Sequence, residues 1–244
     1  MHGGVPRALK LLIVLGATVA VAAALAPRLD RPAGAQSTAP LIPPEPVEGF
    51  VAQSAPLEDD GIEWRPSVPV GLPYDGELFL GVRLPAEGAD FITWDPVRRR
   101  TPNRGWRRWA ADGTIRILLR VLKQFRAANP DAPRIAIGDL SRRHGGDFGK
   151  RFGGLGHASH QNGLDFDLYY PRLDRREWRA KRPELADLAL AQDLVRRFFR
   201  AGAEYVFVGP STGLRGPKRK VQALDHHDDH MHVRFPRRLG APGR

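Results

Sequence analysis

Two stretches of the chain carry hydrophobic residues at the three- and four-residue spacing of an amphipathic helix. The first runs from about residue 114 to 128; Asp112 is its expected N-cap, and Asn129-Pro130 ends it, because the residue before a proline avoids helical backbone. The second spans about residues 185 to 201 and is closed by Gly202. The buried faces are expected to consist of Ile115, Leu118, Leu119, Leu122 and Phe125 in the first helix, and of Leu188, Leu190, Leu194, Val195 and Phe198 in the second.

Short hydrophobic runs bounded by glycine and proline predict β-strands in the rest of the chain. The clearest covers residues 164–170, where the even-numbered residues are hydrophobic and share one face, while Asp165, Asp167 and Tyr169 share the other. The final predicted strand covers residues 230–235 and carries His230, His232 and Arg234 on one face. The other predicted strands cover residues 77–82, 91–94, 134–138 and 204–208.

The helices are segregated from the strands along the chain, which favours an α+β fold with a mainly antiparallel sheet and helices packed on one side. The pattern does not predict the order of the strands. A long glycine-rich loop is expected over residues 139–156, and loops of that length in a compact domain are usually functional or mobile.

The N-terminal part of the chain has the pattern of an export segment. Arg7 and Lys10 precede an apolar run over residues 11–26, a length typical of a signal peptide and short for a spanning helix. Ala-Gly-Ala at residues 33–35 resembles a cleavage site, but the charges over residues 27–31 leave retention as an anchor open. We therefore interpret residues 1–35 as a signal peptide or N-terminal membrane anchor and expect an exported protein of the periplasm or cell envelope.

The remaining boundaries follow from composition. Residues 36–60 are rich in proline and predict a semi-rigid spacer. The short apolar runs begin after this spacer, so residues 61–238 are the expected folded domain, and residues 239–244 are a loose tail.

The composition limits both the partner and the chemistry. The net charge of +11 favours an anionic partner such as nucleic acid, acidic lipid or a cell-wall polymer. Export and the lack of a recognised nucleic-acid motif argue against nucleic acid. The sequence contains no cysteine, so any metal must be held by imidazole and carboxylate groups.

Two clusters of histidines and carboxylates are suited to metal binding. Residues 156–167 contain His160 and Asp167, and residues 226–232 contain His230 and His232 on the final predicted strand. Two histidines and a carboxylate with an open fourth position are typical of a catalytic zinc site. Such a zinc ion lowers the pKa of its bound water to about 7 and polarises a carbonyl group, which suits amide hydrolysis. Asp165 would either orient a ligand or cap the turn.

Simpler interpretations compete with these assignments. The acid-rich run over residues 226–232 would also fit a solvated loop with adventitious metal affinity. Residues 209–213 match a nucleophile elbow, but Gly216-Pro217 excludes the helix that this elbow requires. Residues 98–108 contain six arginines and Trp106, and form either a solvated connection or a substrate contact.

Taken together, several motifs resemble the penicillin-insensitive murein endopeptidases, which belong with lysostaphin, the D-Ala-D-Ala metallopeptidases and hedgehog domains. The motifs are Ile-Gly-Asp-Leu-Ser at residues 137–141, the glycine pair at 145–146, Gly-His-Ala-Ser-His-Gln-x-Gly-Leu-Asp-x-Asp at 156–167, and His-x-x-His-x-His-Val-Arg at 227–234. The resemblance is dense over residues 135–170 and 227–235 and implies a hedgehog/DD-peptidase-like fold. It departs in two respects: members of the family carry cysteines, whereas this chain has none, and residues 171–182 do not align with the family.

The resemblance implies roles for individual residues. His160, Asp167 and His232 would bind zinc, and His157 would be a further ligand or a near neighbour. His230 would take a proton from the zinc-bound water or steady the oxyanion, and His227 would line the site. Independently of the resemblance, Asp165, Ser159, Gln161 and Arg234 are expected either to hold the ligands from behind or to contact the substrate.

The function implied is zinc-dependent hydrolysis of the D-alanyl–diaminopimelate cross-link of peptidoglycan, with no obligate protein partner. Two alternatives stay open at this point. The first is a D,D-carboxypeptidase acting on the same stem peptides, and the second is a non-catalytic basic module that binds the cell wall.

Overall fold

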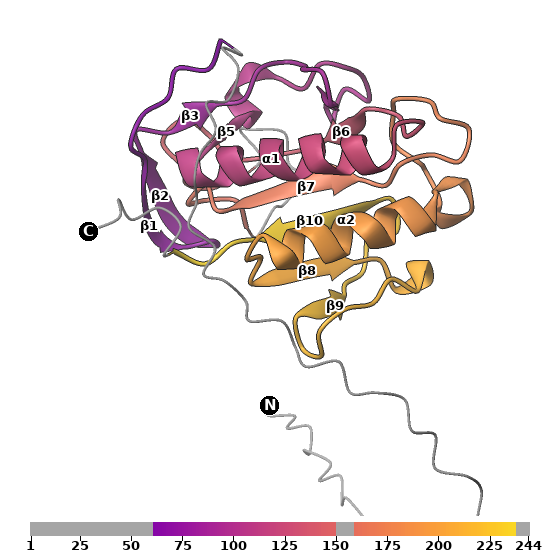
Figure 1. The fold of residues 1–244 in the computed structure, drawn as a ribbon. Coiled ribbons are helices and arrows are strands. Elements are labelled where there is room, and N and C mark those ends of the chain that lie inside the picture. Colours follow the sequence, from indigo (N-terminus) through magenta and orange to yellow (C-terminus); the bar gives the residue numbers. More distant parts are fainter. Residues whose placement is uncertain (1–60, 150–158, 238–244) are drawn as a thin grey trace, which may run out of the picture. The chain divides into compact units, whose positions relative to one another are not determined.

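Two amphipathic helices lie on the same face of a six-stranded β-sheet (Figure 1). The computed structural model describes residues 61–149 and 159–237. The helices are α1 (Asp112–Ala128) and α2 (Leu188–Arg200). In their order across the sheet, the strands are β4 (Phe91–Thr93), β6 (Ile135–Ile137), β7 (Asp165–Tyr169), β10 (His230–Arg234), β8 (Tyr205–Val208) and β9 (Val221–Ala223).

The three central pairings of the sheet are antiparallel, whereas β4–β6 and β8–β9 at its two edges are parallel. This confirms the predicted α+β fold with a mainly antiparallel sheet and helices on one side. Within the described residues, four short strands lie outside this sheet. They form the pairs β1 (Val68–Leu72) with β2 (Asp75–Phe79), and β3 (Val82–Arg83) with β5 (Trp109–Ala110).

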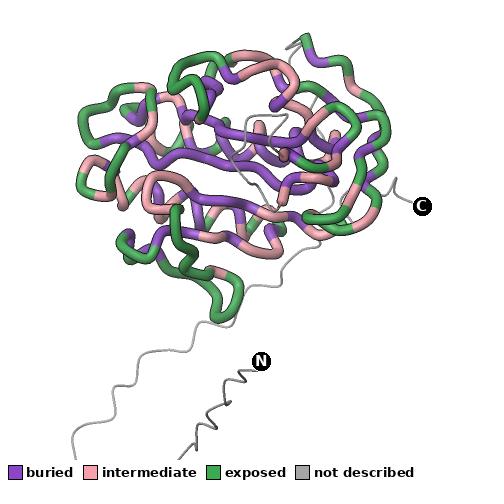
Figure 2. Tube along the Cα trace, turned by 180° about the vertical axis from the view of Figure 1, so that it is seen from behind, coloured by how far each residue is buried: buried purple, intermediate pink, exposed green. Residues whose placement is uncertain are grey.

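The hydrophobic core fills the space between the sheet and the helices. Phe166 and Leu168 of β7, together with Met231 and Val233 of β10, are fully buried in it. The ring of Phe166 lies 5.3 Å from that of Phe198 in α2. Side chains alternate along a strand, so the polar residues of β7 and β10 face away from the helices. Figure 2, from behind, shows buried central strands surrounded by more exposed loops.

The start of α1 differs from the prediction. Ala111 is the N-cap, and Asp112 is the first helical residue instead of the cap. Asp112 exchanges two hydrogen bonds with Ser67, its amide donating to the Ser67 hydroxyl (3.1 Å) and its carboxylate accepting from the Ser67 amide (3.2 Å). A residue distant in the sequence therefore binds the end of the helix, which local spacing cannot predict. The buried face also includes Ile117 and Val121, while Leu119 is only partly buried.

Two other boundaries also differ from the prediction. The strand predicted over residues 77–82 is divided into β2 and β3, because Leu80 between them has a left-handed backbone (φ +52°). The second helix begins at Leu188 after a short 3-10 helix (η3, Pro183–Leu185), and the carboxylate of Asp187 caps it by accepting from the Leu190 amide at 3.1 Å.

The segment that matched a nucleophile elbow is a 3-10 turn (η4, Pro210–Thr212) and not a strand-to-helix elbow. Within the part of the chain that the structure describes, no helix has the length and hydrophobicity needed to cross a membrane. The predicted export segment, the spacer and the tail lie outside the described residues.

Candidate metal centre

Three buried side chains converge on the sheet face opposite the helices. His160, Asp167 and His232 each offer one ligand atom, and these atoms all lie within 4.8 Å of one another. Asp167 Oδ1 is 3.3 Å from His160 Nε2 and 3.0 Å from His232 Nδ1. Two ligand atoms about 2.1 Å from a tetrahedral zinc ion lie roughly 3.4 Å apart. The donor set and its spacing therefore fit such an ion.

The pairing of two strands builds most of this cluster. In the antiparallel register of β7 and β10, Asp167 lies directly opposite His232, so both side chains project from the same face. His160 comes from the loop before β7 and has a left-handed backbone (φ +69°), which is uncommon for a residue other than glycine. This conformation allows the buried imidazole to face the strand pair.

His232 is held between two carboxylates. Its Nδ1 is 3.0 Å from Asp167, and its Nε2 is 3.0 Å from Asp165. Burial lowers the pKa of His232, but the charges and hydrogen bonds of Asp165 and Asp167 outweigh this effect and raise the pKa to about 9. Burial raises the pKa of both carboxyl groups, but neighbouring cationic groups outweigh this effect. His232 acts most strongly on Asp165 and His160 on Asp167, so both pKa values lie below their usual range.

Asp165 links His232 to two residues behind it, Ser159 and Arg234. It accepts hydrogen bonds from Arg234 (3.0 Å) and from the hydroxyl of Ser159, which itself accepts a bond from Arg234 at 2.8 Å. The carboxylate of Asp165 is fully buried. A carboxylate on the far nitrogen of a ligand histidine fixes both the ring orientation and the tautomer. The structure thus brings Ser159, Asp165 and Arg234 together behind His232.

Gln161 has a different position. Its side-chain oxygen accepts from the Gly76 amide (3.3 Å), its backbone amide donates to Pro73 (2.8 Å), and its carbonyl accepts from Gly146 (2.9 Å). A Cβ atom on Gly145 would lie 2.1 Å from that carbonyl, so only glycine fits there. Gln161 therefore fastens the His160 loop to the β1–β2 hairpin and the glycine pair.

His230 lines a cavity next to the three converging residues. Its Nδ1 lies 2.6 Å from Asp229 Oδ1, while Asp229 Oδ2 accepts from Arg179 at 3.1 Å. The ring of His227 stacks on that of His230 with 4.6 Å between centroids. Burial, followed by repulsion from His230, lowers the pKa of His227. The cavity has a volume of about 710 Å³, and Asp167, His227, His230 and His232 all contribute to its wall.

A buried ion pair that the sequence pattern did not single out lies beside the centre. Arg107 and Asp139 are both fully buried and bonded to each other, and Asn103 donates to Asp139 at 3.0 Å. The backbone carbonyl of Asp139 accepts from the amide of Asp167 at 2.9 Å. The arginine-rich segment is therefore partly a structural support for β7, which neither interpretation of residues 98–108 foresaw. The position of Asp139 directly after a predicted hydrophobic strand was the signal in the sequence for a buried carboxylate.

Asp229 and His157 complete the comparison of the predicted site with the structure. Asp229 was not predicted as a site residue, although its position directly before His230 in an acid-rich cluster was a usable signal. His157 lies outside the described residues.

Comparison with known proteins identifies the family of the chain. A family model described as penicillin-insensitive murein endopeptidase matches residues 69–197, more than half of the chain. The chain belongs to this family. A curated relative, the penicillin-insensitive murein endopeptidase of Haemophilus influenzae, is 27% identical over 193 residues, which cover 68% of this chain and 63% of the relative. The alignment thus spans less than two thirds of the relative's length.

The penicillin-insensitive murein endopeptidase match covers two of the three converging residues. It includes His160 and Asp167 but ends at residue 197, before β10 with His230 and His232. The strand register supplies what the family match omits, because it sets His232 opposite Asp167.

Proposed function

We propose that the protein is a zinc-dependent murein endopeptidase that hydrolyses the D-alanyl–diaminopimelate cross-link of peptidoglycan. The observation that carries this proposal is the buried cluster of His160, Asp167 and His232, which opens onto a cavity with further histidines. Membership of the family supports the reaction class. The net charge of +11 suits an anionic wall polymer.

His160, Asp167 and His232 would hold the metal ion, with Asp165 orienting His232 from behind. Their nitrogen and oxygen atoms are ligands that zinc accepts, in the three-ligand pattern of catalytic sites. When bound, zinc would lower the pKa of a water molecule to about 7 and polarise the scissile carbonyl. A chain without cysteine has no thiolate that could close the site.

His230 is the residue we assign to proton transfer or to stabilising the oxyanion. Asp229 binds its Nδ1, and Arg179 in turn holds Asp229, so the Nε2 atom is available to a substrate in the cavity. A carboxylate that is hydrogen-bonded to one imidazole nitrogen fixes the orientation and the tautomer of the ring. His227, stacked on the same ring and neutral at physiological pH because of its lowered pKa, would support this orientation.

The proposal includes a location. We infer an exported protein acting in the periplasm or cell envelope, with residues 1–35 as signal or anchor, residues 36–60 as spacer and residues 61–238 as the catalytic domain. The supporting observations are the apolar run over residues 11–26 and the family membership.

Metal removal tests the function directly. The zinc-loaded protein is expected to convert purified dimeric muropeptides to monomers, and a chelator should lower the rate by at least about 100-fold, because the polarising ion contributes several kcal/mol. Re-addition of zinc should restore it, and a β-lactam should have no effect. Mass spectrometry of the products separates the alternatives: released alanine would indicate a carboxypeptidase. If zinc-loaded protein leaves the dimers intact, the endopeptidase proposal is wrong.

The raised pKa of His232 predicts proton release on metal binding. In the metal-free protein this pKa is about 9, so the ring is protonated at pH 7, and a ligating imidazole must lose one proton. Zinc affinity should therefore rise about tenfold per pH unit below pH 9 from this group alone. Calorimetry in buffers of different ionisation enthalpy counts the released protons. In the Asp165→Asn variant, fewer protons should be released on zinc binding near pH 8, because the carboxylate that raises the pKa of His232 is lost. An unchanged proton count would contradict the assignment of the released proton to His232.

A further inference from the structure

A second cavity shares a wall residue with the cavity that contains His230. It has a volume of about 820 Å³, and Arg99 lines both this cavity and the one that contains His230. Its walls come from the arginine-rich segment and from residues 175–178, together with strand β4 and Arg134. A ligand that extends from the metal centre past Arg99 would therefore enter it.

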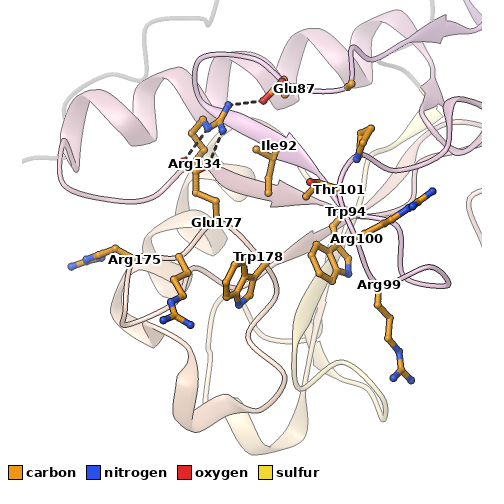
Figure 3. A pocket seen from close by; sticks show the side chains of 13 residues that line it. Glu87, Ile92, Trp94, Arg99, Arg100, Thr101, Arg134, Arg175, Glu177 and Trp178 are labelled. Carbon is orange, nitrogen blue, oxygen red and sulfur yellow. Dashed lines mark hydrogen bonds and ion pairs between the residues drawn. The ribbon is translucent and has the colours of Figure 1, made fainter.

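Two tryptophans give this cavity flat apolar surface. Trp178 is 44% exposed, with the guanidinium group of Arg176 5.2 Å from its ring centroid, and Trp94 and Ile92 also line the wall. Figure 3 shows Trp178 and Trp94 next to each other, with Ile92 above them. Exposed aromatic surface in a concave site is typical of ligand binding, and an indole face suits the apolar face of a sugar ring.

The charged residues around the tryptophans leave positive charge available. Both glutamates in the wall, Glu87 and Glu177, bind Arg134, at 3.0 Å and 2.7 Å. Arg99 and Arg100, in contrast, form no ion pair with any residue in the described ranges 61–149 and 159–237. Figure 3 shows both side chains on the side of Trp94 away from Trp178 and from the Arg134 pairs, with their guanidinium groups pointing in different directions. A guanidinium group without an acidic partner is suited to a carboxylate, which it binds with two parallel hydrogen bonds.

Trp178 is held in place by the same ion pairs. Arg134 lies directly before β6 and donates two hydrogen bonds, of 2.9 Å and 2.7 Å, to the carboxylate of Glu177, the residue before Trp178. The hydrogen bonds and the charge of Glu177 raise the pKa of Arg134 above its usual value. The segment that carries Trp178 is thereby fastened to the sheet, so its indole is pre-positioned in the wall.

We propose that this cavity is a binding site for the part of the peptidoglycan substrate next to the cleaved bond: carboxylates at Arg99 and at Arg100, and a flat sugar or apolar face on Trp178. This inference rests on the proposed function for the identity of the ligand. The carboxylates belong to the stem peptide, and the flat face is either the sugar attached to that stem or the aliphatic part of the stem itself.

Binding of uncleavable ligands tests this site without requiring catalysis. The full chain is titrated by calorimetry with a disaccharide tripeptide, the disaccharide alone and the tripeptide alone; none contains a cross-link or a terminal D-alanyl pair. We expect Trp178→Ala to weaken binding of the disaccharide tripeptide at least tenfold. Arg100→Gln should weaken it about fivefold, with the loss shrinking at high salt.

Matched controls remove similar side chains elsewhere. Tyr74→Ala deletes another exposed aromatic residue (56% exposed), and Arg98→Gln deletes the neighbouring arginine that does not line the cavity. Both should bind all three ligands as the wild type does. If the sugar occupies Trp178, that variant loses affinity for the disaccharide alone; if the stem does, it loses affinity for the tripeptide alone.

The outcomes separate this inference from the proposed function. If Trp178→Ala and Arg100→Gln both bind all three ligands like the wild type, the site is wrong even when dimeric muropeptides are cleaved. Conversely, if the variants lose binding but zinc-loaded wild type cleaves nothing, the site stands and the catalytic proposal fails.

Discussion

Replacement of His160 or Asp167 by alanine is expected to abolish stable zinc retention and to lower endopeptidase activity by at least about 1,000-fold. Loss of a residue behind a metal ligand already costs 10- to 100-fold in affinity or activity, and these two side chains offer the ligand atoms themselves. The measurement is metal content after dialysis, by atomic emission, beside the rate of dimer cleavage.

His144→Ala is the matched control for this experiment. His144 is exposed, and its backbone carbonyl accepts from Leu78, a bond that alanine preserves. The control should retain one zinc ion and full activity. A His160→Ala protein that keeps stoichiometric zinc and wild-type activity would remove His160 from the ligand set.

The second large effect is expected from His230→Ala, which should lower kcat by about 100- to 10,000-fold while zinc content stays stoichiometric. This range is typical of a lost general acid or base, and His230 is not among the three converging side chains. Steady-state kinetics on dimeric muropeptides, with metal analysis of the same sample, measures both quantities.

Asp229→Asn refines the assignment of His230. It keeps the size of the side chain but removes the charge that binds His230 Nδ1 at 2.6 Å and Arg179 at 3.1 Å. We expect a smaller loss of kcat than for His230→Ala, because the imidazole is still present but its orientation and tautomer are held less firmly. A His230→Ala variant that loses zinc together with activity would instead identify His230 as a ligand.

The sequence predicted the parts of the fold that depend on local periodicity. The alternation over residues 164–170 correctly separated the core-facing residues from Asp165 and Asp167, because successive side chains of a strand point to opposite faces of the sheet. The same phase argument put His230, His232 and Arg234 on one face of β10. Two half-sites could therefore be predicted, each on its own strand.

The features that the sequence missed depend on contacts between distant segments. Asp112 bonds to Ser67, 45 residues away, so the first turn of α1 needs no local cap. Arg107 looked like one of several solvated arginines, but it is buried against Asp139, 32 residues away. The cavity with Trp178 combines two segments that no periodic pattern connects. Tertiary packing decides such positions.

The opposition of Asp167 and His232 across β7 and β10 restricts where the chain can accept insertions. One residue added within β10 before His232 would turn every later side chain of that strand over, so that the imidazole faces the core and Met231 or Val233 faces the cavity. The same insertion in the exposed residues 215–220, between η4 and β9, leaves this phase unchanged. Length variation among related chains should therefore gather in that connection and be absent from the two paired strands.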